Sequence, residues 1–172
     1  MKASANSRRR YWLWVTRREH YIDKKGKDSN KLDPSNFDGR KSWWTCHRDT
    51  RKGDLALLWR ASPKCDIGYL IQVESDAFSL KDDKDAARNH WKYGCNYHSL
   101  LRFTQPITLA ELRDEPYFSG WKPRKSNFRG IAFEIEPADW IKLTNMAFEK
   151  EIRGLQESLT NLKTIRSRLK RT

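Results

Sequence analysis

Residues 53–74, GDLALLWRASPKCDIGYLIQVE, determine the fold that this sequence predicts. Two runs rich in aliphatic and aromatic residues, LALLWRAS and GYLIQVE, have the composition of β-strands. Lys52-Gly53-Asp54 predicts a turn before the first run, and Ser62-Pro63 ends that run. A short loop containing Asp66 separates the two runs. The stretch therefore predicts two consecutive strands of a sheet.

Three further strands follow from the same kind of pattern. Residues 10–16, RYWLWVT, carry aromatic and branched side chains at both sets of alternating positions, which favours a central strand buried on both faces. Residues 97–103 predict a fourth strand, which Pro106 closes, and residues 131–135 predict the last one. The sheet should therefore have a hydrophobic layer on each side.

Polar stretches and capping signals separate these strands. Residues 23–40 predict a loop, with a short helix begun by Asp33-Pro34. Residues 76–94 form a long polar connection that carries Trp91. Thr108 and Glu111 form a capping-box pattern for a short helix, and a second helix is predicted to start at Pro137.

The C-terminal segment differs from the rest in its periodicity. After Phe148, the residues Ile152, Leu155, Leu159, Leu162, Ile165 and Leu169 recur at spacings close to the coiled-coil period. This amphipathic helix spans less than three heptads and contains Gly154, so it must pack on something to be stable. Its own domain, a helical protein partner and a second copy of the chain all remain open as that surface.

The net charge of +13 is concentrated at the two ends of the 172-residue chain. Residues 1–31 carry +7 and residues 150–172 carry +5, whereas the residues between them carry only +1. Basic edges around a neutral fold favour a polyanionic partner, although a solubilising charge distribution explains the same pattern. Three widely spaced cysteines and the lack of a long apolar run predict a soluble protein with free thiols, cytoplasmic and associated with nucleoid or RNA rather than secreted or membrane-bound.

The order of these motifs resembles that of an EVE domain, a member of the PUA-like superfamily related to YTH domains. The resemblance rests on YWLWVT, KGDLALLW, RAS, IGYLIQVE, FTQPITLAELR and FRGIAFEIEPADWIKL, and it covers residues 10–145. It implies an α+β fold, a PUA-like curved β-barrel of five or six strands surrounded by short helices. Residues 1–9, a basic N-terminal arm, and residues 146–172, the amphipathic basic helix, fall outside the family pattern.

The resemblance also implies a function without a reaction. EVE and YTH domains bind nucleic acid that carries a modified base, such as a methylated adenine or a methyl- or hydroxymethylcytosine, and enclose the flipped base in an aromatic pocket. Such readers are often the recognition part of a restriction or defence system. Whether the strand is DNA or RNA does not follow from the sequence.

By position in the family pattern, Trp44 matches one wall of that pocket, and Trp91 lies in the loop that carries the second wall. Trp59 stands where EVE domains usually have a tyrosine or phenylalanine, and Ser62 matches a serine a few residues later. Trp43 is either a third wall or the core member of the Trp43-Trp44 pair. For each tryptophan a core role is the alternative. Polar side chains such as Ser62 and Thr16 are candidates for binding the edge of the base.

A set of basic residues is expected to hold the phosphates around the pocket, although each could equally belong to a solvated loop. Several lie in the stretch 120–130, where cations alternate with Trp121 and Phe128. The opening strand runs into TRREHY, which departs from the family's usual turn at the point where that turn carries base contacts. The predicted backbone-binding residues are Arg17, Arg48, Arg51, Lys122, Arg124, Lys125 and Arg129, with Arg8–Arg10 as a further arm.

An enzyme and an adaptor are the competing classes. Cys46 and His47 are adjacent, a spacing that rarely lets a thiol and an imidazole act as nucleophile and base. His90, Cys95 and His98 lack a convincing metal-ligand pattern, and no phosphate-binding glycine loop occurs. We therefore expect no catalysis, no metal and no cofactor. An adaptor that docks a partner through the C-terminal helix is the alternative function.

Overall fold

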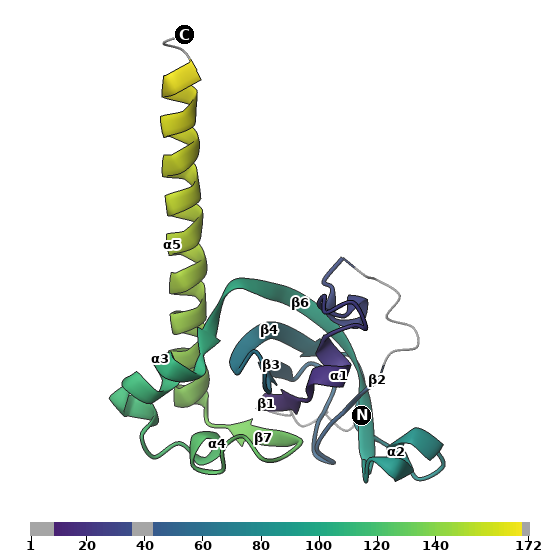
Figure 1. Ribbon diagram of the computed structural model, residues 1–172. Helices are drawn as coiled ribbons and strands as arrows, with labels where there is room; N and C mark the ends of the chain where they lie inside the picture. Colours follow the sequence, from purple (N-terminus) through teal and green to yellow (C-terminus); the bar gives the residue numbers. More distant parts are fainter. Residues whose placement is uncertain (1–8, 36–42, 170–172) are drawn as a thin grey trace, which may run out of the picture.

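The structure is a computed structural model that describes residues 9–35 and 43–169. Within these residues, seven strands form one strongly curved sheet (Figure 1). Six of them lie in the order β2-β6-β4-β3-β1-β7, and β5 pairs with one end of β6. The β1–β3 pair is parallel and the other pairs are antiparallel. The strands are β1 (Tyr11–Thr16), β2 (Trp43–Thr45), β3 (Leu55–Arg60), β4 (Asp66–Val73), β5 (Phe78–Ser79), β6 (Tyr93–Thr108) and β7 (Ala132–Ile135).

Helices cover the two faces of this sheet unequally. One face is covered by the helices of the second half of the chain, and the other by α1 and the segment that follows it. The helices are α1 (Arg18–Tyr21), the 3-10 helix η1 (Asn30–Leu32), α2 (Lys84–Arg88), α3 (Leu109–Asp114), the 3-10 helix η2 (Pro116–Phe118), α4 (Lys122–Lys125) and α5 (Pro137–Leu169). This arrangement is a curled half-barrel, because no described pairing joins β2 to β7.

Strand periodicity explains why both faces are hydrophobic, as the sequence predicted. In β1, Leu13 packs with the cluster under α3, α4 and α5, whereas Trp12 and Trp14 pack with the opposite cluster. In β3, Trp59 joins the first cluster and Leu58 the second. We call the first side the core face and the second, which contains Trp44, the cavity face.

The Gly53-Asp54 pair predicted as a turn also anchors the start of β1. The Asp54 carboxylate is buried, and it accepts hydrogen bonds from the Trp12 indole N–H at 2.9 Å and from the backbone N–H groups of Arg10 and Arg51. Gly53 has φ 89°, a conformation that glycine adopts without steric cost. The turn residues therefore fix β1 beside β3 through a buried carboxylate that accepts three hydrogen bonds.

The second half of the opening stretch holds a buried ion pair. The Arg60 guanidinium donates two hydrogen bonds to Asp66, at 2.6 and 2.8 Å, and a third to Asp28 in the loop after α1. A Cβ atom on Gly68 would lie 2.4 Å from Arg60 Nε, so this position leaves room for the guanidinium. Tyr69 also donates to Asp28. These contacts hold the segment that follows α1 against the sheet.

The fourth strand is longer than predicted. β6 continues through Pro106 to Thr108, because its register with β4 shifts between Ile67 and Tyr69. Around this shift the strand is bound by α5: Glu151 accepts from the Gln105 backbone N–H at 2.7 Å, and Lys150 donates to the Pro106 carbonyl. A proline without an N–H is tolerated at such an irregularity.

Three polar stretches contain more regular structure than expected. η1 ends just before Asp33, and Pro34 lies in a turn. The rest of the helix predicted to begin at Asp33-Pro34 lies outside the described residues. The connection 76–94 contains β5 and α2, and the basic stretch 120–130 contains α4. Each of these helices is five residues or shorter, so side-chain caps and tertiary contacts rather than periodicity determine them.

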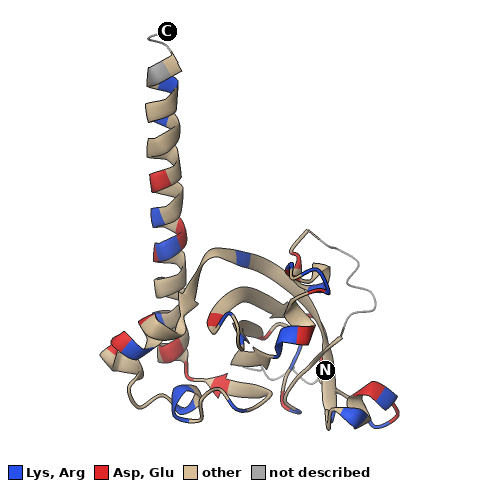
Figure 2. Ribbon diagram, in the orientation of Figure 1, with Lys and Arg blue, Asp and Glu red and all other residues tan. Residues whose placement is uncertain are grey.

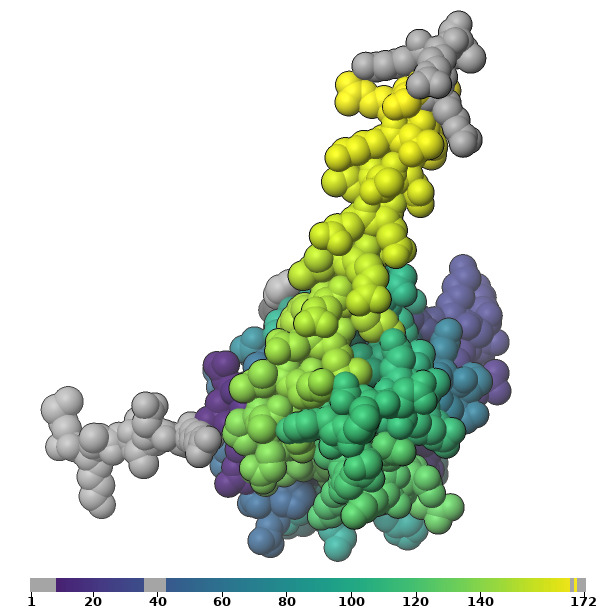
Figure 3. All heavy atoms as spheres, turned by 90° about the vertical axis from the view of Figure 1, so that its left-hand side faces the viewer, coloured from purple at the N-terminus to yellow at the C-terminus, as the bar shows by residue number. Residues whose placement is uncertain are grey.

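The helix predicted at Pro137 and the amphipathic C-terminal helix are one element, α5, so the predicted boundary at 145/146 falls inside it. Its first turns are buried on the core face through Trp140, Leu143 and Ala147. Its outer part projects away from the sheet (Figures 1 and 3). No helix among the described residues is long and apolar enough to cross a membrane. The predicted basic arm lies almost entirely outside the described residues, since only Arg9 of residues 1–9 is included.

Candidate functional site

A cavity of about 980 Å³ lies on the open side of the half-barrel. It is bordered by β2, by the end of β1 with α1, by α2 with the residue that follows it, and by the segment 127–131 that leads into β7. Six residues with ring side chains line it: His20, Trp43, Trp44, Trp91, Tyr97 of β6, and Phe128. The cavity therefore combines an aromatic lining with access from the sheet edge.

Trp43 and Trp44 contribute to this lining in different ways. In β2 they pair with Asn96 and Cys95 of β6, and their side chains leave the strand in opposite directions. Trp44 packs edge-on against Tyr97, with ring centroids 5.6 Å apart. Trp43 is half-buried and packs edge-on against Trp91 at 5.9 Å. Both members of the pair therefore line the cavity. Trp44 also belongs to the hydrophobic cluster of the cavity face, whereas Trp43 does not.

Trp91 is held in place by the end of α2. Asp83 caps this helix by accepting from the Ala86 N–H, and His90 then adopts a left-handed conformation with φ 57°. This turn brings the Trp91 backbone N–H to the Ala86 carbonyl at 2.9 Å. Such a fixed backbone orients the half-exposed indole toward the cavity.

His20 is a ring of the cavity that the sequence did not identify. It lies on α1, in the TRREHY segment that departs from the family pattern. Its imidazole centroid is 5.3 Å from that of Trp91 and 6.5 Å from that of Trp44. A histidine in a four-residue helix has no periodic signal, so only its place after the first strand could have suggested this role.

The charge state of His20 follows from its surroundings. Burial lowers the pKa of the imidazole, the nearby Glu19 raises it, and Arg17 and Lys31 lower it further. The net shift is downward from the ordinary value of 6.5. His20 is therefore neutral at pH 7, with one nitrogen that donates and one that accepts.

Three buried polar atoms at the cavity have no hydrogen-bond partner among the described residues. They are Trp44 Nε1, His20 Nε2 and Thr45 Oγ1, and all three residues line the cavity. Leaving such a group unpaired costs about 1–3 kcal/mol. Three other buried polar atoms of the described residues, on Trp14, Thr50 and Ser99, are also unpaired, but these residues do not line the cavity. The informative feature is that three unpaired atoms gather at one cavity. This set therefore indicates a site for a ligand or water that donates and accepts hydrogen bonds.

The segment on the far side of the cavity has an unusual backbone. Asn127 and Phe128 are both left-handed, with φ 51° and 55°. This conformation is uncommon for a bulky side chain and costs roughly 1–2 kcal/mol. The Phe128 ring stacks on Trp59 at 3.7 Å and 7°, so the core face holds the segment in this shape at the cavity border. Strained backbone of this kind is typical of ligand sites.

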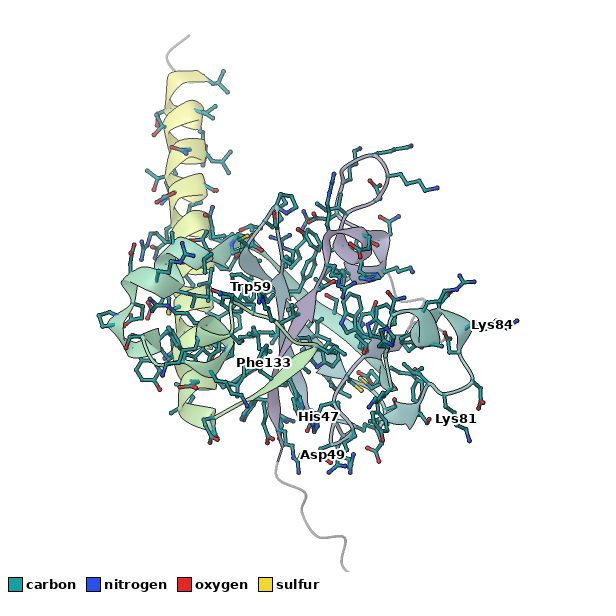
Figure 4. All side chains as sticks on the ribbon, turned by 60° about the horizontal axis from the view of Figure 1, so that its bottom comes forward. His47, Asp49, Trp59, Lys81, Lys84 and Phe133 are labelled. Atoms are coloured by element: carbon teal, nitrogen blue, oxygen red, sulfur yellow. The ribbon has the colours of Figure 1, made fainter. Side chains whose placement is uncertain are left out.

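The structure brings together four of the six predicted pocket residues. Trp43, Trp44, Trp91 and Thr16 all line the cavity. Trp59 does not: it is 3% exposed and lies in the core face under Phe128 (Figure 4). Ser62 does not line the cavity either, because it is exposed beyond the end of β3. The neighbouring Ala61 takes the position at the cavity instead.

Only part of the predicted basic set borders the cavity. Arg17 and Arg129 line it, and Lys31, which was not predicted, joins them. Glu19, Asp23 and Asp85 also line it, so the border carries both signs of charge. Lys122, Arg124 and Lys125 lie on the neighbouring α4 (Figure 2). Arg48 and Arg51 lie in the turn after β2, marked by His47 and Asp49 in Figure 4, and neither lines the cavity.

The residues weighed as catalytic or metal-binding have other environments. Cys46 is buried beside β6, and the His47 ring stacks on Trp12 at 5.4 Å. In residues 9–35 and 43–169 no three histidine, cysteine or acidic side chains are placed to hold a metal ion. The residues that line the cavity offer stacking, hydrogen bonding and charge.

Together these elements define an α+β PUA-like fold with an aromatic cavity on its open side. No protein-family model matches the sequence, and no curated protein matches it. Solved structures do match. The DUF55 domain of human thymocyte nuclear protein 1 aligns with a TM-score of 0.57 and 14% identity, over 80% of this chain and 98% of that chain. The matches confirm the predicted EVE-type fold.

Two further solved structures align with this chain over a similar length. Rpa0253 from Rhodopseudomonas palustris aligns with a TM-score of 0.61 and 16% identity, over 80% of this chain and 92% of that chain. Human THYN1 protein in complex with 5-methylcytosine-containing DNA aligns with a TM-score of 0.56 and 15% identity, over 80% and 97%. At these identities the likeness concerns the fold, and function has to be argued from the site.

Proposed function

We propose that this protein is a non-catalytic reader that binds nucleic acid carrying a modified base and encloses the flipped base in the aromatic cavity. The observation that carries the proposal is the coincidence of stacking rings with the orphaned donors and acceptors of Trp44, His20 and Thr45 at one cavity. A similarly folded protein, human THYN1, has been solved with 5-methylcytosine-containing DNA. We infer the same class of ligand for this chain.

The rings and the polar atoms have separate tasks in this mechanism. Stacking on an indole contributes about 1–3 kcal/mol for any base. A methyl group in an apolar slot adds about 0.8 kcal/mol, or roughly four-fold in affinity. The choice of base therefore falls to Trp44 Nε1, the neutral His20 imidazole and Thr45 Oγ1, which a base edge would satisfy. A base without matching groups leaves them unpaired, at about 1–3 kcal/mol each.

Phosphates would be held beside the cavity by cations from two sides. Arg17 follows β1, and Arg129 lies in the strained segment before β7. The α4 cations extend this second side. Because acidic residues share the border, we expect a modest electrostatic contribution and a small number of phosphate contacts.

Fluorescence titration at a stated salt concentration tests the proposal. Oligonucleotides that are identical except for one cytosine, 5-methylcytosine, 5-hydroxymethylcytosine or methyladenine are compared, as single and double strands. We expect one modified base to bind several-fold more tightly than its unmodified counterpart. Equal affinity for all of them would refute reading of a modification.

Variants locate the site in the same assay. Trp91→Ala should weaken binding of the preferred oligonucleotide by about 1–3 kcal/mol, since it removes one stacking surface. Tyr117→Ala is the matched control, because Tyr117 is an exposed aromatic residue that does not line the cavity. Equal loss in both variants would show that binding does not use the cavity.

A further inference from the structure

A row of apolar side chains on the outer part of α5 is exposed to solvent. Its members, the apolar stripe, are each 41–70% exposed: Phe148, Ile152, Leu155, Leu159, Leu162 and Ile165. Figures 1 and 3 show this part of the helix extending beyond the domain. Since a contiguous apolar surface of this kind marks an interaction site, the stripe needs a partner.

The contact between α5 and its own domain reaches the first residue of the stripe: Phe148 packs edge-on against Phe103 of β6, with ring centroids 6.3 Å apart, and is still 41% exposed. From Ile152 to Ile165 the stripe residues are 52–70% exposed. The face toward the domain contains Ala147, buried, and Lys150, which donates to Glu111. Phe148 lies one residue after Ala147, which is about 100° around the helix. The stripe therefore follows the side of α5, beside the domain contact, and the spacing of its residues matches the seam of a two-helix coiled coil.

The charges on α5 distinguish the possible orientations of a second helix. Its carboxylates after Phe148 are Glu149, Glu151 and Glu157, and in the sequence every charged residue beyond Glu157 is a cation. Figure 2 shows the charged residues of the described part of this helix. Two parallel copies would place these cationic ends side by side, with Arg166 facing its own copy in the seam. Two antiparallel copies would place each cationic end along the half of the other helix that carries the exposed Glu149 and Glu157, although Lys150 and Arg153 leave that half with a net charge of only −1.

We propose that a second copy of this chain docks on the apolar stripe in an antiparallel coiled coil. In the register that centres the stripe, Ile152 faces the partner's Leu162 and Leu155 faces the partner's Leu159. Glu149 and the partner's Lys163 then flank the seam on the same side, and both side chains are exposed. Neither makes an ion pair within the described part of the chain. Arg166 lies over the partner's Phe148, where its stem and its cation both fit an aromatic ring.

This pairing has consequences for the rest of the molecule. The two Phe148 residues are separated by 18 helical positions, or about 27 Å along the axis. The two domains then lie at opposite ends of the paired helices, and each keeps its own cavity. Each helix contributes six large exposed side chains to this contact, whereas specific complexes in general bury more than about 1,000 Å² in total. The inference does not depend on the ligand of the cavity.

Analytical ultracentrifugation of the full chain over a concentration series tests the dimer. We expect a monomer–dimer equilibrium that Leu155→Glu with Leu159→Glu weakens roughly ten-fold or more. Thr160→Glu, on the opposite side of the helix, is the matched control and should leave the dissociation constant unchanged. Circular dichroism and tryptophan emission check that each variant folds. A monomer at all concentrations, or a dimer insensitive to the double variant, overturns the proposal.

Charge exchange tests the orientation separately. Glu149→Lys and Lys163→Glu should each weaken self-association about two- to five-fold per ion pair, because each places like charges together. An equimolar mixture of the two variants should restore the dimer, since both contacts are again attractive in the mixed pair. The chain that carries both substitutions should also regain the self-association of the unmodified chain. If neither the mixture nor the double variant recovers, the antiparallel register is wrong.

Discussion

Two buried tryptophans, Trp59 on the core face and Trp44 on the cavity face, are almost equally inaccessible, at 3% and 8% exposure. Their surroundings differ. Trp59 is stacked flat under Phe128 at 3.7 Å and belongs to a cluster closed by α4 and α5. Trp44 packs edge-on against Tyr97, lines a cavity and has an indole N–H without a partner among the described residues.

The difference shows that burial alone does not separate a core residue from a ligand-binding one. What separates them is whether open space lies beside the ring: Trp44 lines the cavity and Trp59 does not. An unpaired N–H adds to this only together with that space, since Trp14 Nε1 is also unpaired among the described residues and Trp14 does not line the cavity. Trp12 makes the same point on the cavity face: it is as buried as Trp59, but its N–H is bound to Asp54 at 2.9 Å. The predictions below test this distinction.

The largest loss in the free energy of unfolding is expected from a substitution on the core face. Trp59→Ala removes a fully packed indole and its stack on Phe128, and large-to-small changes of this kind cost about 3–5 kcal/mol. Urea unfolding followed by circular dichroism measures the free energy of unfolding. Trp91→Ala, at a half-exposed ring of the cavity, should cost much less in the same experiment. Similar losses would mean that the two faces do not differ in the way described.

Much of this contrast was accessible from the sequence, and its limits have physical causes. The burial of both sheet faces follows from β1 alone, where large side chains occupy both alternating sets of positions. Trp43, Trp44 and Trp91 were predicted at the cavity from their positions in the family pattern. Trp59 was misplaced because that pattern aligns positions along the chain, whereas the face of the sheet depends on register: Trp59 shares its face with Leu57.

The remaining features depend on tertiary contacts. His20 lies in a four-residue helix that periodicity cannot detect, and its orientation depends on how the segment after α1 is held by Asp28 and Arg60. The continuity of α5 was missed because Thr144 and Asn145 interrupt its apolar pattern. Thr144 bonds back to the Trp140 carbonyl within the helix instead of ending it.

A second prediction separates the satisfied indole from the unsatisfied one. Trp44→Phe should change stability by at most about 1.5 kcal/mol, because it removes a donor that has no partner in the free protein. Trp12→Phe, the matched control, should cost about 1–3 kcal/mol more, because it leaves the Asp54 carboxylate short of a buried hydrogen bond. The free energy of unfolding is the measurement for both.

Binding should respond in the opposite order if the proposed function is right. Trp44→Phe should weaken binding of the preferred modified oligonucleotide by about 1–3 kcal/mol, whereas Trp12→Phe should leave it unchanged once its folding is accounted for. A Trp44→Phe variant with full affinity would show that the free N–H does not serve the ligand.

The cavity face should also be sensitive to pH. The pKa of His20 is already lowered by burial, and a stacked base would bury the imidazole further, so the complex requires the neutral form. Affinity should therefore be constant above pH 7 and fall as the pH drops through the lowered pKa of His20, by at most about ten-fold per pH unit. His20→Gln should flatten this profile. Stronger binding at low pH would instead indicate that the charged imidazole attracts phosphate.

The smallest effect concerns the edge of the core face, where Lys150 of α5 binds Glu111 at 2.6 and 2.7 Å. Burial raises the pKa of Glu111, but the contacts with Lys150 and with Thr108 outweigh it, and the net pKa is below 4.5. A lowered carboxyl pKa contributes stability above pH 4.5 that is lost as the pH falls through the lowered value.

Because both side chains are partly exposed, Glu111→Gln should cost only about 0.5–1 kcal/mol at pH 7, and the difference from the unmodified protein should shrink in acid. Urea unfolding at pH 7 and pH 3 measures it, with Glu157→Gln as the control, because Glu157 is exposed and makes no ion pair within the described residues. A cost that persists unchanged at pH 3 would mean that Glu111 acts through packing and not through its charge.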